Sequence, residues 1–196
     1  MDKHAIRRGA WLLFVLAMAT GAAQGREIAG VKLAERINAS GGQSLVLNGA
    51  GIRYKFIFKI YVAALYLPAK ADTARAVLDA PGPKRMLMHF VYHKVTAAQM
   101  RDGWKDGFED NLDSKTYRAL APRIKRFNAL FDALKAGDRV WLDYEPGRGT
   151  KVSVNGQDKG AIPGPDFMRA LLLVWLGPHP PGDDLKRELL GRPTED

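Results

Sequence analysis

Apolar residues alternate with other residues from position 52 to position 68, IRYKFIFKIYVAALYLP. Every even position from 54 to 66 is apolar or aromatic, and Arg53, Lys55 and Lys59 lie at odd positions. A period of two residues is typical of a β-strand with one buried face. Because the stretch is longer than an ordinary strand, we predict two strands or one strongly bent strand. Residues 48–51 are expected to form a turn before it, and residues 31–37 a connecting segment.

A helix is predicted to begin after Thr96. Thr96 and Gln99 have the spacing of a capping box, in which each side chain accepts a hydrogen bond from the backbone of the other residue. Apolar residues then recur every four positions, which places them on one face of a helix. This face consists of Met100, Trp104 and Phe108. The helix is therefore expected to bury this apolar face.

Two glycines lie on this predicted helix, and a proline lies on the next one. Gly103 and Gly107 each cost a helix about 1 kcal/mol relative to alanine. Close packing of the helix against the sheet is the expected reason for them. A second helix is predicted from about residue 116 to 134, with Pro122 near an internal start. The acidic residues of the first helix and the basic residues of the second are expected to form solvated faces.

Turn sequences divide the last third of the chain into short elements. PGRG and NG are typical of hairpin turns, and they predict antiparallel strands at about 139–145, 151–154 and 158–162. Asp166 is expected to cap a buried helix, FMRALLLVWL, that ends at Gly177. Short helices are predicted in ADTARAVLD and DDLKRELLG. This pattern favours one α+β domain.

The N-terminus has the pattern of a secretory signal peptide. Basic residues occur within positions 1–8, an apolar run follows, and TGAAQG then supplies small residues for cleavage. We expect cleavage after Gly25, with Ala22 or Ala23 as alternative sites and an uncleaved anchor as the competing interpretation. The prediction is a signal peptide at 1–25 and a domain at 26–196 in the bacterial periplasm. The chain contains no cysteine, so neither disulfides nor thiolate chemistry contribute.

The chain is basic, with a formal net charge of +9. Removal of residues 1–25 takes away three basic residues and one acidic residue, which leaves +7. A basic surface suits nucleic acid, an anionic membrane surface or an acidic ligand. Export argues against nucleic acid, so a small ligand and association with a membrane surface remain as expected partners.

The sequence offers little catalytic chemistry. His89 and His93 are four residues apart, which in a strand separates them by about 13 Å, too far to share a metal. No serine lies in a nucleophile elbow, and no glycine-rich loop joins a strand to a helix as in nucleotide sites. We therefore expect neither a metal nor another cofactor.

Four segments, in this order, resemble the bacterial secreted members of the chalcone isomerase-like family. They are LNGAGIRYKFIFKIYVAALYLP, YEPGRGTKVSVNG, IPGPDFMRALLLVWLG and LKRELLG, and the resemblance extends from about residue 27 to 191. It implies an open-faced β-sandwich, in which a large antiparallel sheet packs against a layer of helices and a cleft opens between the layers. Plant enzymes of the family close a chalcone into a flavanone by attack of a phenolate oxygen on an enone. Other members hold fatty acids without catalysis.

The resemblance also implies site residues. The arginine that positions and polarises the substrate in the enzymes matches Arg53. A threonine of the following strand falls at Tyr61, and a tyrosine before the long helix falls at Tyr92, with His93 as a competing match. Ligand contact is thus implied for Arg53, Tyr61 and Tyr92. From the residues alone, an ion pair of Arg53 with Asp143 or Glu145 is an equal alternative.

Other positions depart from the enzyme pattern. An asparagine has no clear match, Ala98 and Gln99 being nearest, and a hydroxyl-bearing residue near the end of the buried helix falls at Val174. Each preorganised donor in such a site is worth about 2.7 to 4 kcal/mol. We therefore expect a non-catalytic protein that binds a small apolar or amphipathic ligand such as a fatty acid. The alternative is an intramolecular lyase or isomerase that acts on a chalcone-like enone.

Overall fold

The computed structural model describes residues 25–192, so the predicted signal peptide lies outside the described residues apart from Gly25. Seven strands form one antiparallel sheet in which each strand pairs with its neighbours in the sequence. They are β3 (Arg36–Asn38), β4 (Ser44–Lys55), β5 (Phe58–Leu67), β6 (Lys84–Phe90), β7 (Arg139–Glu145), β8 (Gly149–Val154) and β9 (Gln157–Ile162). A separate hairpin consists of β1 (Arg26–Ile28) and β2 (Val31–Leu33).

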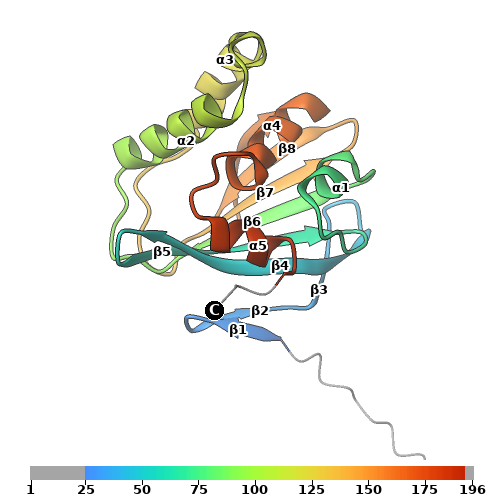
Figure 1. The fold of residues 1–196 in the computed structure, drawn as a ribbon, viewed down its shortest axis with the longest axis vertical. Coiled ribbons are helices and arrows are strands. Elements are labelled where there is room, and N and C mark those ends of the chain that lie inside the picture. The colour runs from blue at the N-terminus through green and yellow to red at the C-terminus, as the bar shows by residue number, and fades with distance from the viewer. Residues whose placement is uncertain (1–24, 193–196) are drawn as a thin grey trace, which may run out of the picture.

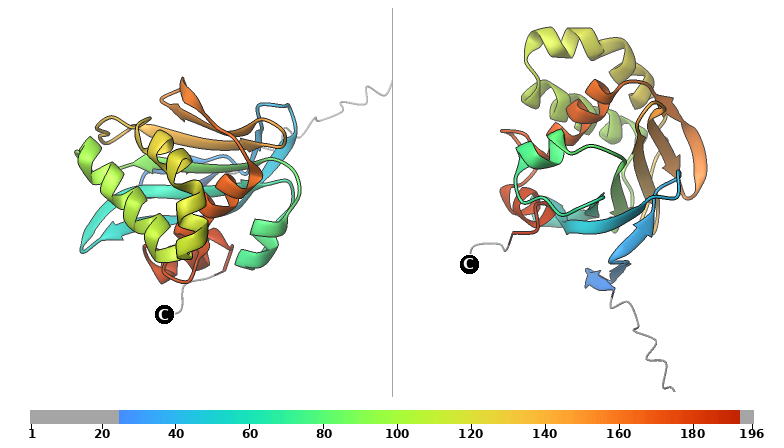
Figure 2. Two further views of the ribbon diagram at one scale, coloured as in Figure 1. Left: turned by 90° about the horizontal axis from the view of Figure 1, so that it is seen from above. Right: turned by 90° about the vertical axis from the view of Figure 1, so that its right-hand side faces the viewer.

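The sheet curls around a layer of helices on one face, and the β1–β2 hairpin lies on the other face (Figures 1 and 2). The helices of the described chain are α1 (Ala74–Asp79), α2 (Ala97–Asn111), α3 (Ser114–Asn128), α4 (Pro165–Leu176) and α5 (Asp183–Leu189). Helix α4 contacts α1, α2, α5 and β8 and so forms the centre of this layer. The predicted α+β class, with a large antiparallel sheet packed against helices, is confirmed.

Both faces of strand β5 are buried from Tyr61 to Leu67. Its odd positions, including Ala63 and Leu65, belong to the core between sheet and helices. Its even positions, including Val62 and Tyr66, belong to a second core under the β1–β2 hairpin, with Val31 and leucines of β2 and β4. The sequence pattern predicted one buried face, and the second is buried because residues 31–38 form strands rather than a connecting segment.

The alternating stretch folds as two strands, β4 and β5, joined by a turn at Phe56 and Ile57. The turn predicted at residues 48–51 is wrong, because these residues lie inside β4. The register shifts between Leu47 and Gly49, and the buried Asn48 side chain hydrogen-bonds to distant backbone groups. A Cβ atom at Gly49 would collide with the backbone oxygen of Glu188, so glycine here allows α5 to approach the strand.

The helical predictions hold in type and differ in detail. The capping box of Thr96 and Gln99 is present at the start of α2. Helix α3 ends at Asn128 rather than near residue 134, and Pro122 lies inside it. The N-cap of α4 is Gly164. Asp166, predicted as the cap, instead accepts hydrogen bonds from Arg123 of α3 at 2.7 and 2.5 Å.

No helix within residues 25–192 combines the length and apolar character that crossing a bilayer requires.

Candidate ligand-binding cleft

A cleft of about 530 Å³ opens between the β4–β5 end of the sheet and helix α2. This volume is within the range of small-molecule sites. Much of the wall is apolar, from Phe58, Ile60, Met88, Phe90, Met100 and Val174. Figure 1 shows α2 on the same side of the sheet as α4, above the end that carries the label β5.

The sheet register places Arg53 and Tyr61 side by side. Arg53 of β4 lies directly opposite Tyr61 of β5, and Tyr61 lies opposite Phe90 of β6. Directly opposed residues share a face with Cβ atoms about 5 Å apart. Phe90 is fully buried, and its ring centroid lies 5.4 Å from that of Tyr61. A half-buried guanidinium and a buried phenol thus line the same part of the cleft.

The Arg53 guanidinium has no carboxylate partner within residues 25–192. Asp143 forms a bidentate ion pair with Arg85, and Glu145 pairs with Arg148 at 3.1 Å. The alternative in which Arg53 pairs with Asp143 or Glu145 is therefore wrong. The positive charge of Arg53 is therefore available to an anion in the cleft.

The Tyr61 hydroxyl accepts one hydrogen bond and retains a proton to donate. Trp175 of α4 donates Nε1–H to Tyr61 Oη at 3.0 Å. Among the described residues, the Tyr61 hydroxyl donates no hydrogen bond. Burial raises the pKa of Tyr61, although the Trp175 hydrogen bond and the charge of Arg53 act to lower it. The phenol therefore stays protonated at neutral pH and acts as a donor, not as a base.

Tyr92 follows β6 and lies at the end of the cleft next to the β4–β5 turn. Its backbone N–H donates to the carbonyl of Ile60 at 3.1 Å, and its ring packs edge-on against Phe58 at 5.7 Å. His93, the competing match, is exposed and is not part of the cleft wall. Arg53, Tyr61 and Tyr92 thus line one cleft, and their contact with a ligand stays a prediction.

The positions that depart from the enzyme pattern also lie at the cleft. Gln99 lines it, but its side-chain oxygen accepts the backbone N–H of Thr96 at 2.8 Å and is held in the capping box. Val174 presents methyl groups where the plant enzymes have a hydroxyl. The wall at Val174 can pack against a hydrocarbon and cannot donate a hydrogen bond, whereas the Gln99 Nε2 group is still a donor.

The cleft carries opposite charges on its two walls. Arg53, Lys55 and Lys94 line the sheet side, whereas Asp102, Asp106 and Asp110 line the side formed by α2. The acidic residues were expected only as a solvated face, although their spacing of four residues places them on one side of a helix. An anionic group in the cleft is therefore attracted toward Arg53 and repelled from α2.

The described residues contain no group of three His, Cys, Asp or Glu side chains that could hold a metal ion.

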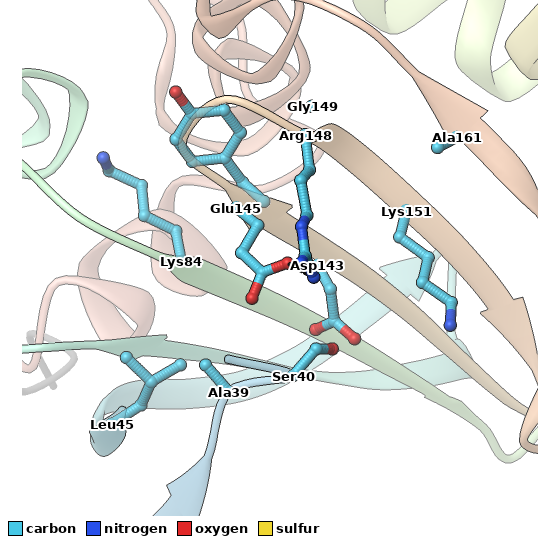
Figure 3. Close-up of a pocket in the computed structure, with 11 residues that line it drawn as sticks. Ala39, Ser40, Leu45, Lys84, Asp143, Glu145, Arg148, Gly149, Lys151 and Ala161 are labelled. Atoms are coloured by element: carbon cyan, nitrogen blue, oxygen red, sulfur yellow. Dashed lines mark hydrogen bonds and ion pairs between the residues drawn. The ribbon is translucent and has the colours of Figure 1, made fainter. Parts of the chain in front are cut away.

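A smaller pocket of about 220 Å³ lies at the other end of the strands (Figure 3). Four of its charged lining residues, Asp143, Glu145, Arg148 and Lys151, form ion pairs, and the Lys84 ammonium donates to the backbone carbonyl of Ala80. Asp143 pairs with Arg85, Glu145 with Arg148, and Lys151 with Asp158 at 3.1 Å. Because most of its charges are paired in this way, the pocket offers less to a charged ligand than the cleft does.

Alanine substitutions at the two glycines of α2 are expected to have opposite effects on stability. No atom of the described chain beyond its own helix lies within 4 Å of a Cβ placed at Gly103, so Gly103→Ala should add about 1 kcal/mol of helix propensity. A Cβ at Gly107 would lie 2.7 Å from Val174 Cγ1, so close packing against α4, not the predicted packing against the sheet, explains this glycine.

Gly107→Ala should therefore lower the free energy of unfolding, because α2 and α4 must separate. Urea unfolding of the two variants beside the wild type measures the difference. A destabilised Gly103→Ala variant would contradict the open space at this position.

Comparisons with known proteins agree with this architecture. Residues 25–191 match the family model described as chalcone isomerase-like. The crystal structure of a fatty-acid-binding protein of Arabidopsis thaliana is similar, with a TM-score of 0.60, 14% sequence identity, and coverage of 80% of this chain and 96% of that chain. At 14% identity this similarity shows a shared fold alone. A comparison with curated proteins gave no match. Because the family model spans most of its length, the chain belongs to the chalcone isomerase-like family.

Proposed function

We propose that the protein binds an amphipathic anion of the fatty-acid class in the cleft between the sheet and α2, without catalysis. The observation that carries the proposal is the half-buried Arg53 guanidinium, which lacks a carboxylate partner in the described chain and lies beside the Tyr61 phenol. A guanidinium holds a carboxylate by two parallel hydrogen bonds, and the phenol adds a third donor. The apolar wall then accommodates a hydrocarbon tail.

The cleft is better suited to binding than to isomerisation. A phenol whose pKa is raised by burial is a poor base near neutral pH, and Val174 contributes no donor to polarise a carbonyl. The similar Arabidopsis protein is a fatty-acid-binding protein, which supports the proposed ligand class. The adjacency of Arg53 and Tyr61 keeps one alternative open, a lyase or isomerase that acts on a chalcone-like enone.

The proposal includes export to the periplasm and membership of the bacterial secreted branch of the family. Its support is the basic start, the apolar run and the small residues before position 26. N-terminal sequencing of the protein isolated from cells should give a start at Ala23, Gln24 or Arg26. A start at Met1 would contradict processing.

Titration calorimetry with a long-chain fatty acid and its methyl ester tests the ligand class. The two have the same chain, but only the acid carries the charge that Arg53 would hold. Because hydrogen bonds to a charged group are worth about 1.5 to 3 kcal/mol, the acid should bind at least about ten-fold more tightly. Equal affinities would contradict a carboxylate anchor.

Two further measurements separate the alternatives. Loss of chalcone absorbance on addition of the protein would favour the isomerase, and an unchanged spectrum is expected. Mass spectrometry of small molecules retained by the protein from its native host should detect a fatty acid or another amphipathic anion.

A further inference from the structure

The tip of the β4–β5 hairpin, residues 54–59, carries an exposed apolar cluster. Phe56 and Ile57 form the turn and are 89% and 84% exposed, and the flanking Tyr54 and Phe58 are 44% and 49% exposed. Among residues 25–192 no other large apolar side chain is exposed. A contiguous cluster of this kind, unlike scattered single residues, indicates a binding surface.

Neither the hydrophobic core nor the geometry of the turn requires an apolar side chain at Phe56 or Ile57. Phe56 has a backbone φ of 56°, in the left-handed region that bulky residues rarely adopt. Hairpin turns of two residues favour glycine, asparagine or aspartate at such positions. Phenylalanine here strains the backbone and packs into neither core cluster, so a function outside the fold best explains it.

The surroundings of the tip are basic. Lys55 and Lys59 are exposed within it, and the sequence has no acidic residue between Glu35 and Asp72. Lys94, also exposed, lines the same side of the cleft, and the acidic residues of the cleft lie on the α2 wall. Aromatic and aliphatic side chains next to lysines are the composition of segments that lie in the interface of an anionic membrane.

The size of the tip also favours a membrane over a protein partner. At these exposed fractions its four apolar side chains offer roughly 500 Å², judged from the area that aromatic side chains bury. A protein interface of standard size buries about 800 Å² from each partner, which is more than the apolar side chains of the tip offer. A convex turn can enter a bilayer interface without a matching groove.

We propose that the hairpin tip docks on the surface of an anionic lipid bilayer, with Phe56 and Ile57 in the interface and Lys55 and Lys59 at the headgroups. Lys55, Phe56 and Phe58 also line the cleft, so docking would place this part of the cleft against the lipid. The proposal rests on the surface of the tip and does not depend on which molecule the cleft binds.

Co-sedimentation with phosphatidylcholine vesicles, with and without phosphatidylglycerol, tests the docking. Wild-type protein should bind best to the vesicles that contain phosphatidylglycerol. Phe56→Ser/Ile57→Ser should lower the partition coefficient at least about ten-fold on that lipid, because the inserted apolar area is lost. Lys55→Gln/Lys59→Gln should lower it about ten- to thirty-fold on anionic vesicles and little on neutral ones.

The matched control is Lys115→Gln/Lys125→Gln, which makes the same charge change at exposed sites on α3 and should keep most of the binding. All variants are prepared as the processed chain that begins at Arg26, so that the apolar run near the N-terminus does not itself bind the vesicles. Docking is overturned if the wild type fails to bind, or if it binds no better than Phe56→Ser/Ile57→Ser. It is also overturned if sedimentation velocity shows that the tip variants instead abolish a dimer.

Discussion

Arg53→Ala is expected to weaken fatty-acid binding by about ten- to hundred-fold, because charged hydrogen bonds worth roughly 1.5 to 3 kcal/mol are lost. The guanidinium is half-buried at the cleft and has no competing carboxylate in the described chain, so its removal should act directly on the ligand. The affinity of Arg53→Lys should lie between those of the wild type and Arg53→Ala, because an ammonium group keeps the charge but lacks the planar pair of donors. Tyr61→Phe and Tyr92→Phe should have smaller effects. Titration calorimetry measures each variant.

The methyl ester of the fatty acid separates loss of the anchor from damage to the cleft. Arg53→Ala should bind the ester as the wild type does, because the apolar wall is intact. Arg126→Ala is the matched control, since it removes an exposed arginine of α3 away from the cleft and should leave both affinities unchanged. An Arg53→Ala variant that binds the acid as tightly as the wild type would reject the anchor.

Asn48→Ala is expected to lower the free energy of unfolding by about 3 to 5 kcal/mol, since each buried polar group left without a partner costs about 1 to 3 kcal/mol. The Asn48 amide donates to the carbonyls of Ala71 and Leu189 at 2.9 and 2.8 Å and accepts from the Ala71 N–H at 2.7 Å. These three bonds join β4 to the segment after β5 and to α5. Urea unfolding followed by circular dichroism measures the loss.

Asn38→Ala provides the comparison within the same sheet. Asn38 lies on the neighbouring strand β3, is exposed, and its side chain forms no hydrogen bond in the described chain. Its substitution should change stability by about 0.5 kcal/mol at most. If both variants lost the same stability, the Asn48 hydrogen bonds would not be the cause.

Residues 48–51 show where sequence reasoning fails. The letters NGAG have the local chemistry of a turn, and a turn was predicted. In the structure Asn48 bonds to a carbonyl 141 residues further along the chain, and glycine at position 49 makes room for the backbone of α5. The reason for these residues is a contact distant in sequence, which no local pattern reports. The capping box at Thr96 and the C-terminal hairpins, which depend on nearby residues, were predicted correctly.

In the candidate site, too, the sequence predicted some features, whereas others depend on contacts distant in sequence. The resemblance of the sequence to a family was enough to select Arg53, Tyr61 and Tyr92, which line one cleft in the structure. The register that sets Arg53 opposite Tyr61 depends on the turn at Phe56 and on a register shift between Arg53 and Tyr54, and the alternating pattern predicted neither. The partners of Asp143 and Glu145 likewise depend on neighbouring strands and turns, which excluded the ion pair with Arg53 only once the fold was known.

The neighbour-to-neighbour order of the sheet has a consequence for the order of folding. The β4–β5, β7–β8 and β8–β9 hairpins join residues close in the sequence, and such local contacts close early and at small entropic cost, whereas α2 and α3 separate β6 from β7 in the sequence. The seam between β4 and α5 is different, because the Asn48–Leu189 hydrogen bond joins opposite ends of the described chain. This closure must wait for the last helix. Until α5 docks, the polar groups of β4 near Asn48 remain in contact with water. A chain still being synthesised therefore lacks the contact between β4 and α5.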